Sequence, residues 1–284
     1  MVFDGKQIRD EILKELADKV VSMENKPTLA EFLIGDDPVS AAYAELKHKI
    51  ALKIGVQFCL YKFSDKDSEE EIVQAIEFLN DDPETDGIMI QIPVPKGFNR
   101  EKLIGAISPA KDVDGLRYCQ GLDSDFKPPV VEAILEAVKR SLENTKYEIR
   151  NTKQISNSNF QKLKQQKIAL IGHGFLVGKP LEKALKELGV ENLTVVTSEN
   201  ILDSKFEILD SDLVISATGK AGIIKPDMVK EGVVLIDAGT AEENGELKGD
   251  IDPETYDKSS YYTPVPGGIG PVTVAMLFKN LVSK

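Results

Sequence analysis

Tyr43 and Lys47 are a pair of residues whose types and spacing could support acid–base chemistry. They stand four residues apart in a segment with helical periodicity, so both lie on one face of the expected helix, with Ser40 one turn earlier. Most helical lysines are simply solvated, and the Tyr-x-x-x-Lys spacing is common. Here, however, the helix follows the carboxyl end of a strand expected at 28–35, and such ends line the ligand-binding crevice of open α/β sheets. A partly desolvated lysine in that place could transfer protons near neutral pH.

Gln91, Asp112 and Asp114 are further candidates for a site. Gln91 interrupts the apolar run within 86–95. A buried amide must find hydrogen-bond partners, either in the core or in a site at the end of the strand. Asp112 and Asp114 flank a valine and precede a glycine. Both could therefore form a turn, or one of them could bind an amino group of a ligand.

A glycine-rich segment at 172–178, Gly-His-Gly-Phe-Leu-Val-Gly, follows an apolar strand expected at 167–172 and precedes a helix. Its glycines follow the pattern G-x-G-x-x-x-G, one residue longer than the common dinucleotide fingerprint. Glycines at such a turn let the backbone approach a pyrophosphate at the N-terminus of the helix. Within a strand–helix–strand series, this pattern predicts a phosphate loop.

The choice between NAD and NADP depends on the residues that end the next strand. Thr197 and Ser198 stand there, and Glu199 follows. Ser198 is small enough to leave room for a 2′-phosphate, whereas Glu199 would repel that phosphate if it turned inward. A second loop, 264–273, is rich in glycine and proline and is suited to close approach to a flat ligand or an anion.

The order of the expected elements supplies the scaffold for these residues. The N-terminal part alternates strands and helices, which implies parallel pairing with right-handed crossovers. A helix that begins at prolines 128 and 129 leads to a second series with the pattern of a dinucleotide-binding sheet. The predicted fold class is therefore α/β, with two α/β domains, the second of them Rossmann-like. We expect one domain at 1–127 plus a C-terminal helix at 268–284, and the other at 128–267, with a polar surface insertion at 144–166.

The composition narrows the class of protein. Of 284 residues, 35 are Lys or Arg and 47 are Asp or Glu, which gives a net charge of −12. A field of that sign repels phosphate, which argues against nucleic acids and anionic membranes as partners. Two cysteines and two histidines without a Cys-His cluster predict reduced thiols and no metal site. Because no secretory leader or membrane-spanning stretch is evident, we expect a cytoplasmic protein.

Five segments together resemble one family, the FolD-type methylenetetrahydrofolate dehydrogenase/cyclohydrolases. They are IGDDPVSAAYAELKHK, DGIMIQIPVP, SPAKDVDGL, GHGFLVGKP and TPVPGGIGPVTVAML, and they occur in the order and spacing of that family. The resemblance implies two α/β domains with a cleft between them, usually in a homodimer. It also implies oxidation of 5,10-methylenetetrahydrofolate with NADP, or with NAD, and hydrolysis of the methenyl product to 10-formyltetrahydrofolate.

The resemblance also assigns roles to residues of this chain. Lys47 would be the catalytic lysine, Gln91 would hydrogen-bond it, and Asp114 would anchor the pterin amino group. The folate-binding residues that it implies are Ser40, Tyr43, Ile90, Ile92, Asp114, Pro266, Gly267 and Gly268. The nucleotide-binding residues that it implies are Gly172, His173, Gly174, Ser198 and Thr240. No metal is implied.

Two departures from the family pattern stand out. The phosphate loop usually reads Gly-Arg-Ser, whereas here it reads Gly172-His173-Gly174, so the arginine that commonly pairs with the 2′-phosphate is absent. The helix at 128 lacks the usual Pro-Cys-Thr-Pro opening. The first departure predicts a weaker preference for NADP. If His173 instead reaches the phosphate as an imidazolium, that preference should grow as the pH falls.

Three alternatives remain at this point. The chain could be a dehydrogenase of the shikimate or amino-acid type, although the KDVDG and PVPGGIGP loops argue against it. It could be a dehydrogenase of the same fold that uses NAD with weak or no cyclohydrolase activity. It could also be a nucleotide-binding regulatory protein without chemistry, although Tyr43, Lys47, Gln91 and Asp114 argue against that.

Overall fold

The computed structural model describes residues 1–143, 161–197, 199–201, 203–243 and 245–283. The predictions for Ser198 and for most of the insertion at 144–166 lie outside these residues. The chain divides into two compact units. The three-strand unit comprises Arg9–Pro129 and Val274–Lys284, and the five-strand unit comprises Met1–Ile8 and Val130–Thr273.

The sheet of the three-strand unit is parallel throughout, in the order β2-β1-β3. Its strands are β1 (Thr28–Ile34), β2 (Gln57–Phe63) and β3 (Gly87–Ile90), and the helices between them are α2 (Pro38–Ile54) and α3 (Glu69–Asp81). Every residue of β1 is buried, as expected of the central strand of a covered parallel sheet. The strand–helix alternation predicted from the sequence is confirmed, although β3 is shorter than the apolar run at 86–95.

The ends of α2 show why the sequence forms this helix. The Asp37 carboxylate accepts a hydrogen bond from the amide of Ser40 at 2.7 Å, and Pro38 occupies the first turn. Gly55 ends the helix with φ at 81°, a left-handed conformation that favours glycine. α3 begins with a capping box between Ser68 and Glu71.

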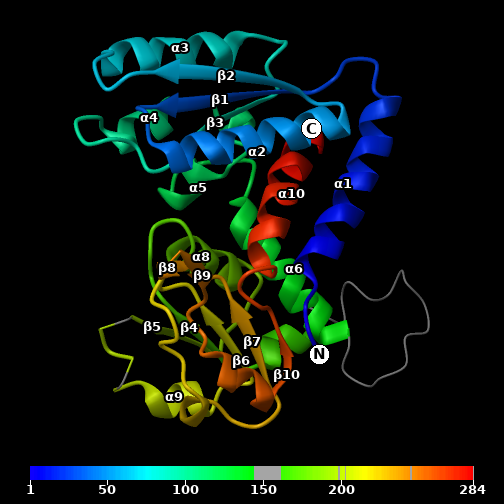
Figure 1. Ribbon diagram of the computed structural model, residues 1–284, viewed down its shortest axis with the longest axis vertical. Helices are drawn as coiled ribbons and strands as arrows, with labels where there is room; N and C mark the ends of the chain where they lie inside the picture. The colour runs from blue at the N-terminus through cyan, green and yellow to red at the C-terminus, as the bar shows by residue number, and fades with distance from the viewer. Residues whose placement is uncertain (144–160, 198, 202, 244, 284) are drawn as a thin grey trace. The chain divides into compact units, whose positions relative to one another are not determined.

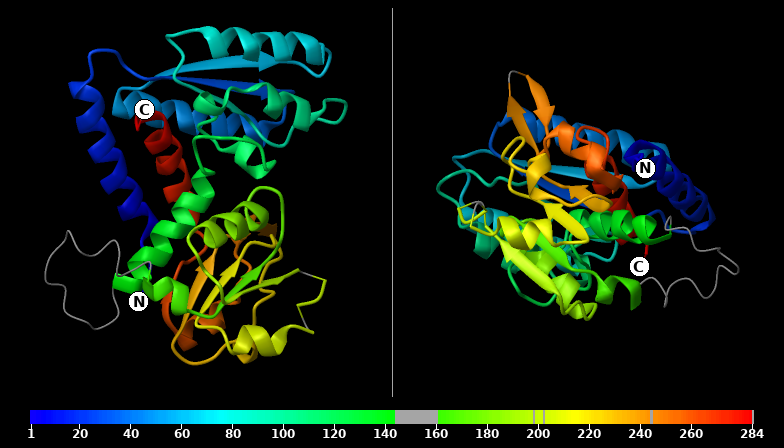
Figure 2. Two further views of the ribbon diagram at one scale, coloured as in Figure 1. Left: turned by 180° about the vertical axis from the view of Figure 1, so that it is seen from behind. Right: turned by 90° about the horizontal axis from the view of Figure 1, so that it is seen from below.

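The core of the three-strand unit combines residues from both ends of the chain. Helices α1 (Gly5–Ser22) and α10 (Ile269–Val282) supply buried apolar side chains, and Figures 1 and 2 show the two helices side by side within this unit. Leu13 and Leu16 of α1 lie in one cluster with Leu29 of β1 and with Phe278 and Leu281 of α10. Burial of one such side chain contributes about 1.5–3 kcal/mol, so residues 274–282 are a substantial part of this core.

The segment that carries Asp112 and Asp114 is built from short helices. They are α4 (Arg100–Ala106), the 3₁₀ turn Pro109–Lys111 and α5 (Leu116–Cys119), and the longer α6 (Pro129–Glu143) follows. The sequence of 109–127 shows no period because helices of three or four residues are too short to display one. Gly115 joins the turn to α5 with φ at 63°, and a Cβ there would lie 2.5 Å from the Pro128 nitrogen.

The five-strand unit has a parallel sheet in the order β10-β7-β6-β4-β5. Its strands are β4 (Ile168–Ile171), β5 (Leu193–Val196), β6 (Leu213–Ser216), β7 (Val233–Asp237) and β10 (Ser259–Tyr262). The other elements are α8 (Gly178–Glu187), α9 (Lys205–Leu209), two 3₁₀ turns (Pro226–Met228 and Pro253–Lys258) and the hairpin β8 (Ala241–Glu243) with β9 (Glu246–Lys248). The series from β4 to β7 follows the sequence prediction, whereas the hairpin, α9 and β10 were not predicted.

Residues 1–3 extend the sheet of this unit beyond β10. Val2 pairs with Tyr262 in a parallel bridge, and the amide of Phe3 donates to the carbonyl of Tyr262 at 2.9 Å. The amide of Gly5 donates to the carbonyl of Gly267 at 3.0 Å. The first eight residues therefore group with the five-strand unit, whereas the sequence prediction grouped them with residues 9–127.

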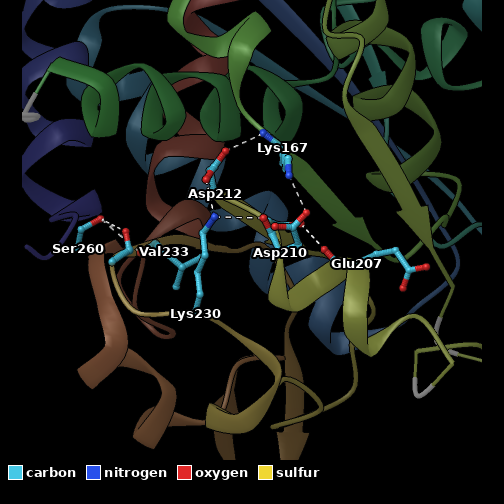
Figure 3. A network of polar contacts seen from close by, with 9 residues as sticks. Lys167, Glu207, Asp210, Asp212, Lys230, Val233 and Ser260 are labelled. Carbon is cyan, nitrogen blue, oxygen red and sulfur yellow. Dashed lines mark hydrogen bonds and ion pairs between the residues drawn. The ribbon is translucent and has the colours of Figure 1, made fainter.

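Asp212 ties together the amino ends of three strands of the five-strand unit, as Figure 3 shows. Its carboxylate accepts from the amide of Lys167 at 2.9 Å and from Nζ of Lys230 at 2.6 Å. Nζ of Lys167 also reaches Asp210 at 2.7 Å. This network lies at the end of the sheet opposite the phosphate loop and is structural. None of the helices in the described ranges has the length and apolar composition needed to cross a membrane.

Candidate active site

Lys47 lies on the buried stripe of α2, together with Ser40, Ala44, Ala51 and Ile54. Only 7% of Lys47 is exposed, although a lysine carries a charge that normally seeks water. Its Nζ atom lies 2.6 Å from Oε1 of Gln91 and 2.9 Å from Oε1 of Glu31. The structure therefore brings together Lys47 and Gln91, which the sequence had singled out separately.

Glu31 is a residue of this site that sequence reasoning missed. It stands in the middle of β1 and is fully buried. Burial raises the pKa of its carboxyl, and the nearby Lys47 ammonium opposes that shift. The signal in the sequence was one acidic residue inside the apolar run Thr-Leu-Ala-Glu-Phe-Leu-Ile, at a position that alternation cannot distinguish from the core.

Asp112 and Asp114 have different environments. Asp112 is fully buried and accepts hydrogen bonds from the amides of Leu116 and Arg117 and from Oγ of Ser124. It organises the turn into α5, and burial raises its pKa to about 6. Asp114 is half-buried, and its carboxylate makes no hydrogen bond to the described residues. The structure thus gives the turn-forming role to Asp112 and leaves the Asp114 carboxylate available to a ligand.

The electrostatics of Asp114 connect it to the lysine. Burial raises the pKa of Asp114 to about 7, with the Lys47 ammonium opposing the shift and the Asp112 and Glu31 carboxylates adding to it. Lys47, Gln91, Glu31, Asp112 and Asp114 thus form one cluster in the three-strand unit, with one cation among three carboxyl groups. Carboxyl groups whose pKa is raised by burial beside a single buried cation are typical of functional clusters.

The other predicted folate-binding residues of the three-strand unit differ in exposure. Tyr43 is 53% exposed and lies beside the buried stripe of α2, so its ring is free to stack on a flat ligand. Ser40 is buried in the first turn of the same helix, and its amide donates to the cap residue Asp37. Ile90 is fully buried, so only its backbone could meet a ligand, whereas Ile92 is half-buried.

Pro266, Gly267 and Gly268 belong to the five-strand unit. Pro266 is exposed, and Gly267 has φ at 106°, which a residue with a side chain rarely adopts. A Cβ at Gly268 would lie 2.5 Å from the carbonyl oxygen of Pro264. This loop is therefore held in its shape by glycines before α10 begins.

The predicted phosphate loop joins β4 to α8, as expected. Gly172 has φ at 100°, and a Cβ there would lie 2.4 Å from the carbonyl oxygen of Ala217. A Cβ at Gly178 would lie 2.1 Å from the carbonyl oxygen of Gly172. Gly174, in contrast, faces open space, with nothing within 4 Å of its Cβ position. Gly172 and Gly178 are needed for close packing. Gly174 leaves room beside the loop, as a bound pyrophosphate requires.

His173 is engaged by an acidic residue that the sequence did not reveal. Its Nε2 atom lies 2.6 Å from Oε2 of Glu182, which stands nine residues further along the chain in α8. Oε1 of Glu182 accepts from Nζ of Lys186 at 2.6 Å, and that hydrogen bond is the main cause of the lowered pKa of Glu182. His173 and Thr240 are both exposed. A 2′-phosphate beside His173 would therefore also meet the Glu182 carboxylate.

The loop after β6 is held by a buried carboxylate. Asp250 is fully buried and accepts from Oγ of Ser216 and from the amides of Thr218 and Lys220. A Cβ at Gly239 would lie 2.0 Å from this carboxylate, so a glycine is required there. In such sheets the loops at the carboxyl ends of the strands face the ligand, and Asp250 fixes one of them.

The remaining candidates for chemistry are weak. Cys119 is partly buried, and burial together with the neighbouring Asp114 and Asp112 raises its pKa to about 12, which makes it a poor nucleophile. Cys59 is exposed and free. Among the residues that the structure describes, no group of three or more His, Cys, Asp and Glu side chains is arranged to hold a metal ion.

Comparison with known proteins assigns the chain to a family. The model of the tetrahydrofolate dehydrogenase/cyclohydrolase catalytic domain matches residues 3–114, and that of the NAD(P)-binding domain of the same enzymes matches residues 150–284. The chain belongs to the tetrahydrofolate dehydrogenase/cyclohydrolase family. This assignment confirms the resemblance seen in the sequence and, with the parallel sheets, the predicted Rossmann-like second domain.

Relatives of the tetrahydrofolate dehydrogenase/cyclohydrolase family match along nearly their whole length. The bifunctional protein FolD of Caldanaerobacter subterraneus is 38% identical over 99% of this chain and 95% of its own. A crystal structure of the bifunctional FolD enzyme from Campylobacter jejuni has a TM-score of 0.85 at 30% identity and covers 100% of this chain and 97% of its own. The FolD of Trypanosoma brucei, solved with NADP and an inhibitor, has a TM-score of 0.85 at 26% identity, with coverage of 100% and 96%.

Proposed function

We propose that this chain oxidises 5,10-methylenetetrahydrofolate with NADP and hydrolyses the methenyl product to 10-formyltetrahydrofolate. The observation that carries the proposal is the buried Lys47, held by Gln91 and Glu31 within the unit that matches the catalytic-domain model. Membership of the family supports the same reading and disfavours a shikimate-type or amino-acid-type dehydrogenase. The carboxylate of Asp114, free of hydrogen bonds to described residues, supports the assignment of a folate-binding role.

The residues of the five-strand unit fit a dinucleotide. Gly172 and Gly178 allow the tight turn, and the open space beside Gly174 leaves room for a pyrophosphate. We propose that Gly172, His173, Gly174, Ser198 and Thr240 hold the nucleotide. When bound, the nicotinamide supplies the acceptor for a hydride. The oxidation needs orientation of the folate more than acid or base, and we assign that orientation to Asp114 and Tyr43.

The hydrolysis needs a proton acceptor, because water loses a proton as it adds to the methenyl carbon. Lys47 is the group that we assign to this proton, since it is buried and faces the amide of Gln91. The Oε1 atom of Gln91 accepts a hydrogen bond from Nζ of Lys47, and its Nε2 atom donates to the carbonyl of Ile92 at 2.9 Å. The amide is thereby fixed from both sides and holds the lysine in one position.

The contact between His173 and Glu182 bears on the choice of cofactor. The Glu182 carboxylate lies 2.6 Å from His173 and repels a second anion, such as a 2′-phosphate, at the same place. NADP is therefore bound less favourably relative to NAD than it would be by a loop with an arginine at this position. We therefore propose that NADP is bound, but that its advantage over NAD is smaller than in relatives with Gly-Arg-Ser in this loop.

Further features of the proposal follow from family membership. We propose a homodimer in the cytoplasm, with the two domains that the sequence predicts, a folate-binding domain at 1–127 and 268–284 and a nucleotide domain at 128–267. Light scattering of the purified protein tests the dimer.

One assay tests the function. Purified protein is mixed with 5,10-methylenetetrahydrofolate and either NADP⁺ or NAD⁺, and the absorbance of the methenyl product and of the reduced nucleotide is followed. We expect reduced nucleotide to form in both cases, and added methenyltetrahydrofolate to decay to the formyl product. Absence of both reactions would contradict the proposal, and oxidation without hydrolysis would support the NAD-type dehydrogenase instead.

A further inference from the structure

Glu31 is an ionisable side chain in a place that normally holds a hydrophobic one. In the sheet it pairs with Leu60 of β2 and Met89 of β3, and none of its surface is exposed. A buried carboxylate is costly unless a partner of opposite charge compensates it. Its contact among the described residues is Nζ of Lys47 at 2.9 Å. The Lys47 ammonium is therefore the group that compensates the buried carboxylate of Glu31.

Lys47 contacts two groups on two strands of the sheet. Glu31 reaches it from β1 at 2.9 Å, and Gln91 reaches it from the residue after β3 at 2.6 Å. The other titratable groups that act on this cluster are Asp114 and Asp112, from the segment before α5. Burial raises the pKa of Glu31, so its carboxyl is a better proton acceptor than an exposed glutamate.

We propose that Glu31 is a positioning residue that accepts a proton from Lys47 while the lysine takes one from the attacking water. The inference rests on the proposed function and deepens it. A lysine paired with a carboxylate is an ammonium, and an ammonium cannot act as a base until it has lost a proton. Glu31 supplies the acceptor for that proton. It does not touch the substrate and acts only through Nζ of Lys47.

The proton balance of the step is closed. As the bond between the water oxygen and the methenyl carbon forms, one proton leaves the water for Nζ of Lys47, and one proton of the ammonium moves to Oε1 of Glu31. As the bond from carbon to N5 then breaks, Nζ of Lys47 gives a proton to N5, the carboxyl of Glu31 returns its proton to Nζ, and the hydroxyl of the adduct loses its proton to solvent. The sum is one proton released to solvent for each cation hydrolysed.

The first arm of the test compares Glu31→Gln with the unaltered protein. We expect the kcat for methenyl hydrolysis to fall at least tenfold, the KM for the folate to change less than threefold, and the oxidation rate to fall less than the hydrolysis rate. Glu31→Asp, which keeps a carboxylate, should recover part of the loss. The control is Glu45→Gln, which removes an exposed carboxylate from the same helix as Lys47. Equal losses in both activities, or none, would overturn the inference.

Two further measurements do not depend on the folding of Glu31→Gln. In mixtures of H₂O and D₂O, the unaltered protein should show a curved proton inventory for hydrolysis, because two protons move together. A linear inventory would overturn the relay. The Tm of Lys47→Met should be several degrees lower than that of the double variant Glu31→Leu/Lys47→Met, since the single change leaves a buried carboxylate without its cation. Equal Tm values would show that the ion pair does not form.

These outcomes separate the inference from the function on which it rests. If the unaltered protein performs neither reaction, the proposed function fails and the relay fails with it, while the two Tm values still report the ion pair. If both reactions occur but Glu31→Gln hydrolyses at the unaltered rate, only the relay is wrong.

Discussion

The Nζ atom of Lys47 lies 2.6 Å from the Oε1 atom of Gln91, and the Nε2 atom of the same amide donates to the carbonyl of Ile92. This arrangement sets the direction of the amide, since its nitrogen is already engaged. Gln91 can therefore only accept from the lysine. The amide oxygen of Gln91 and the carboxylate of Glu31 both contact Nζ of Lys47. Together they fix the position of a group that can donate and accept a proton.

Lys47→Met should abolish hydrolysis of methenyltetrahydrofolate. General acid–base catalysis contributes about 10²–10⁴-fold, and Lys47 is the group that we assign to the proton. Folate should still bind, because Asp114 and Tyr43 are untouched. Hydrolysis is measured by the decay of methenyl absorbance and binding by titration calorimetry, with Lys49→Met on the exposed face of α2 as control. Hydrolysis at the unaltered rate would show that the lysine moves no proton.

Asp114→Ala should weaken folate binding at least tenfold. A charge-assisted hydrogen bond contributes about 1.5–3 kcal/mol, and 1.4 kcal/mol corresponds to a factor of ten. The unaltered protein should also bind folate more weakly as the pH falls from 8 to 6. The pKa of Asp114 is raised to about 7, so the carboxyl gains a proton in this interval and becomes a poorer acceptor for pterin N–H groups.

Calorimetric titration with folate at pH 6, 7 and 8 checks both parts of this prediction. Asp114→Asn should remove most of the pH dependence, because an amide does not titrate. A dissociation constant that Asp114→Ala leaves unchanged would return Asp114 to the role of a plain turn residue.

Asp112→Ala should destabilise the three-strand unit without a direct effect on ligand contact. Asp112 accepts three hydrogen bonds, and its removal leaves the buried amide of Leu116 without that partner. Each buried donor that loses its partner costs about 1–3 kcal/mol. Thermal unfolding should show a fall of several degrees in Tm, whereas Asp123→Ala, at an exposed position, should change Tm by less than one degree.

His173→Arg combined with Gly174→Ser should raise the preference for NADP over NAD about tenfold or more. Arginine supplies a permanent, bidentate partner for the 2′-phosphate. The serine fits, because no atom lies within 4 Å of a Cβ at Gly174. The measurement is kcat/KM for both nucleotides at pH 6 and pH 8.

The same experiment tests two competing accounts of the phosphate site. If His173 takes part in holding the phosphate, the preference of the unaltered protein for NADP should change in the double variant. If a strong preference persists at pH 8 and does not change in the double variant, the phosphate is held elsewhere. Lys220 is then the better candidate, since Nζ of Lys225 is paired with Asp252 at 2.6 Å.

Features set by residues close together in the chain were predicted from the sequence, whereas contacts between residues distant in the chain were not. The helix that carries Lys47, the phosphate loop and the parallel strand series follow from residues close together in the chain, and they were predicted. Glu31 and its pairing with Lys47 were not, because strand register brings Glu31 beneath a helix that begins after it. The contact between His173 and Glu182 was missed for a similar reason, since it depends on how the loop folds back onto α8.

The sequence also left the roles of Asp112 and Asp114 open. Both precede Gly115 and differ by two positions, so spacing cannot separate them. Only the three-dimensional turn shows that Asp112 is enclosed by amides of α5 and Asp114 is not. The short strand β10 and the hairpin β8–β9 lack a hydrophobic period, which is why pattern analysis did not find them.

The composition of the two units has a consequence for synthesis on the ribosome. The core of the three-strand unit needs Phe278 and Leu281, and the edge of the five-strand sheet needs residues 1–3 beside Tyr262. Neither unit can be completed until more than 260 residues have been translated, and residues 1–8 must wait for a partner strand made near the end. We therefore expect nascent chains stalled before residue 260 to be sensitive to protease in both units, and fragments cut at the unit boundary to fold poorly on their own.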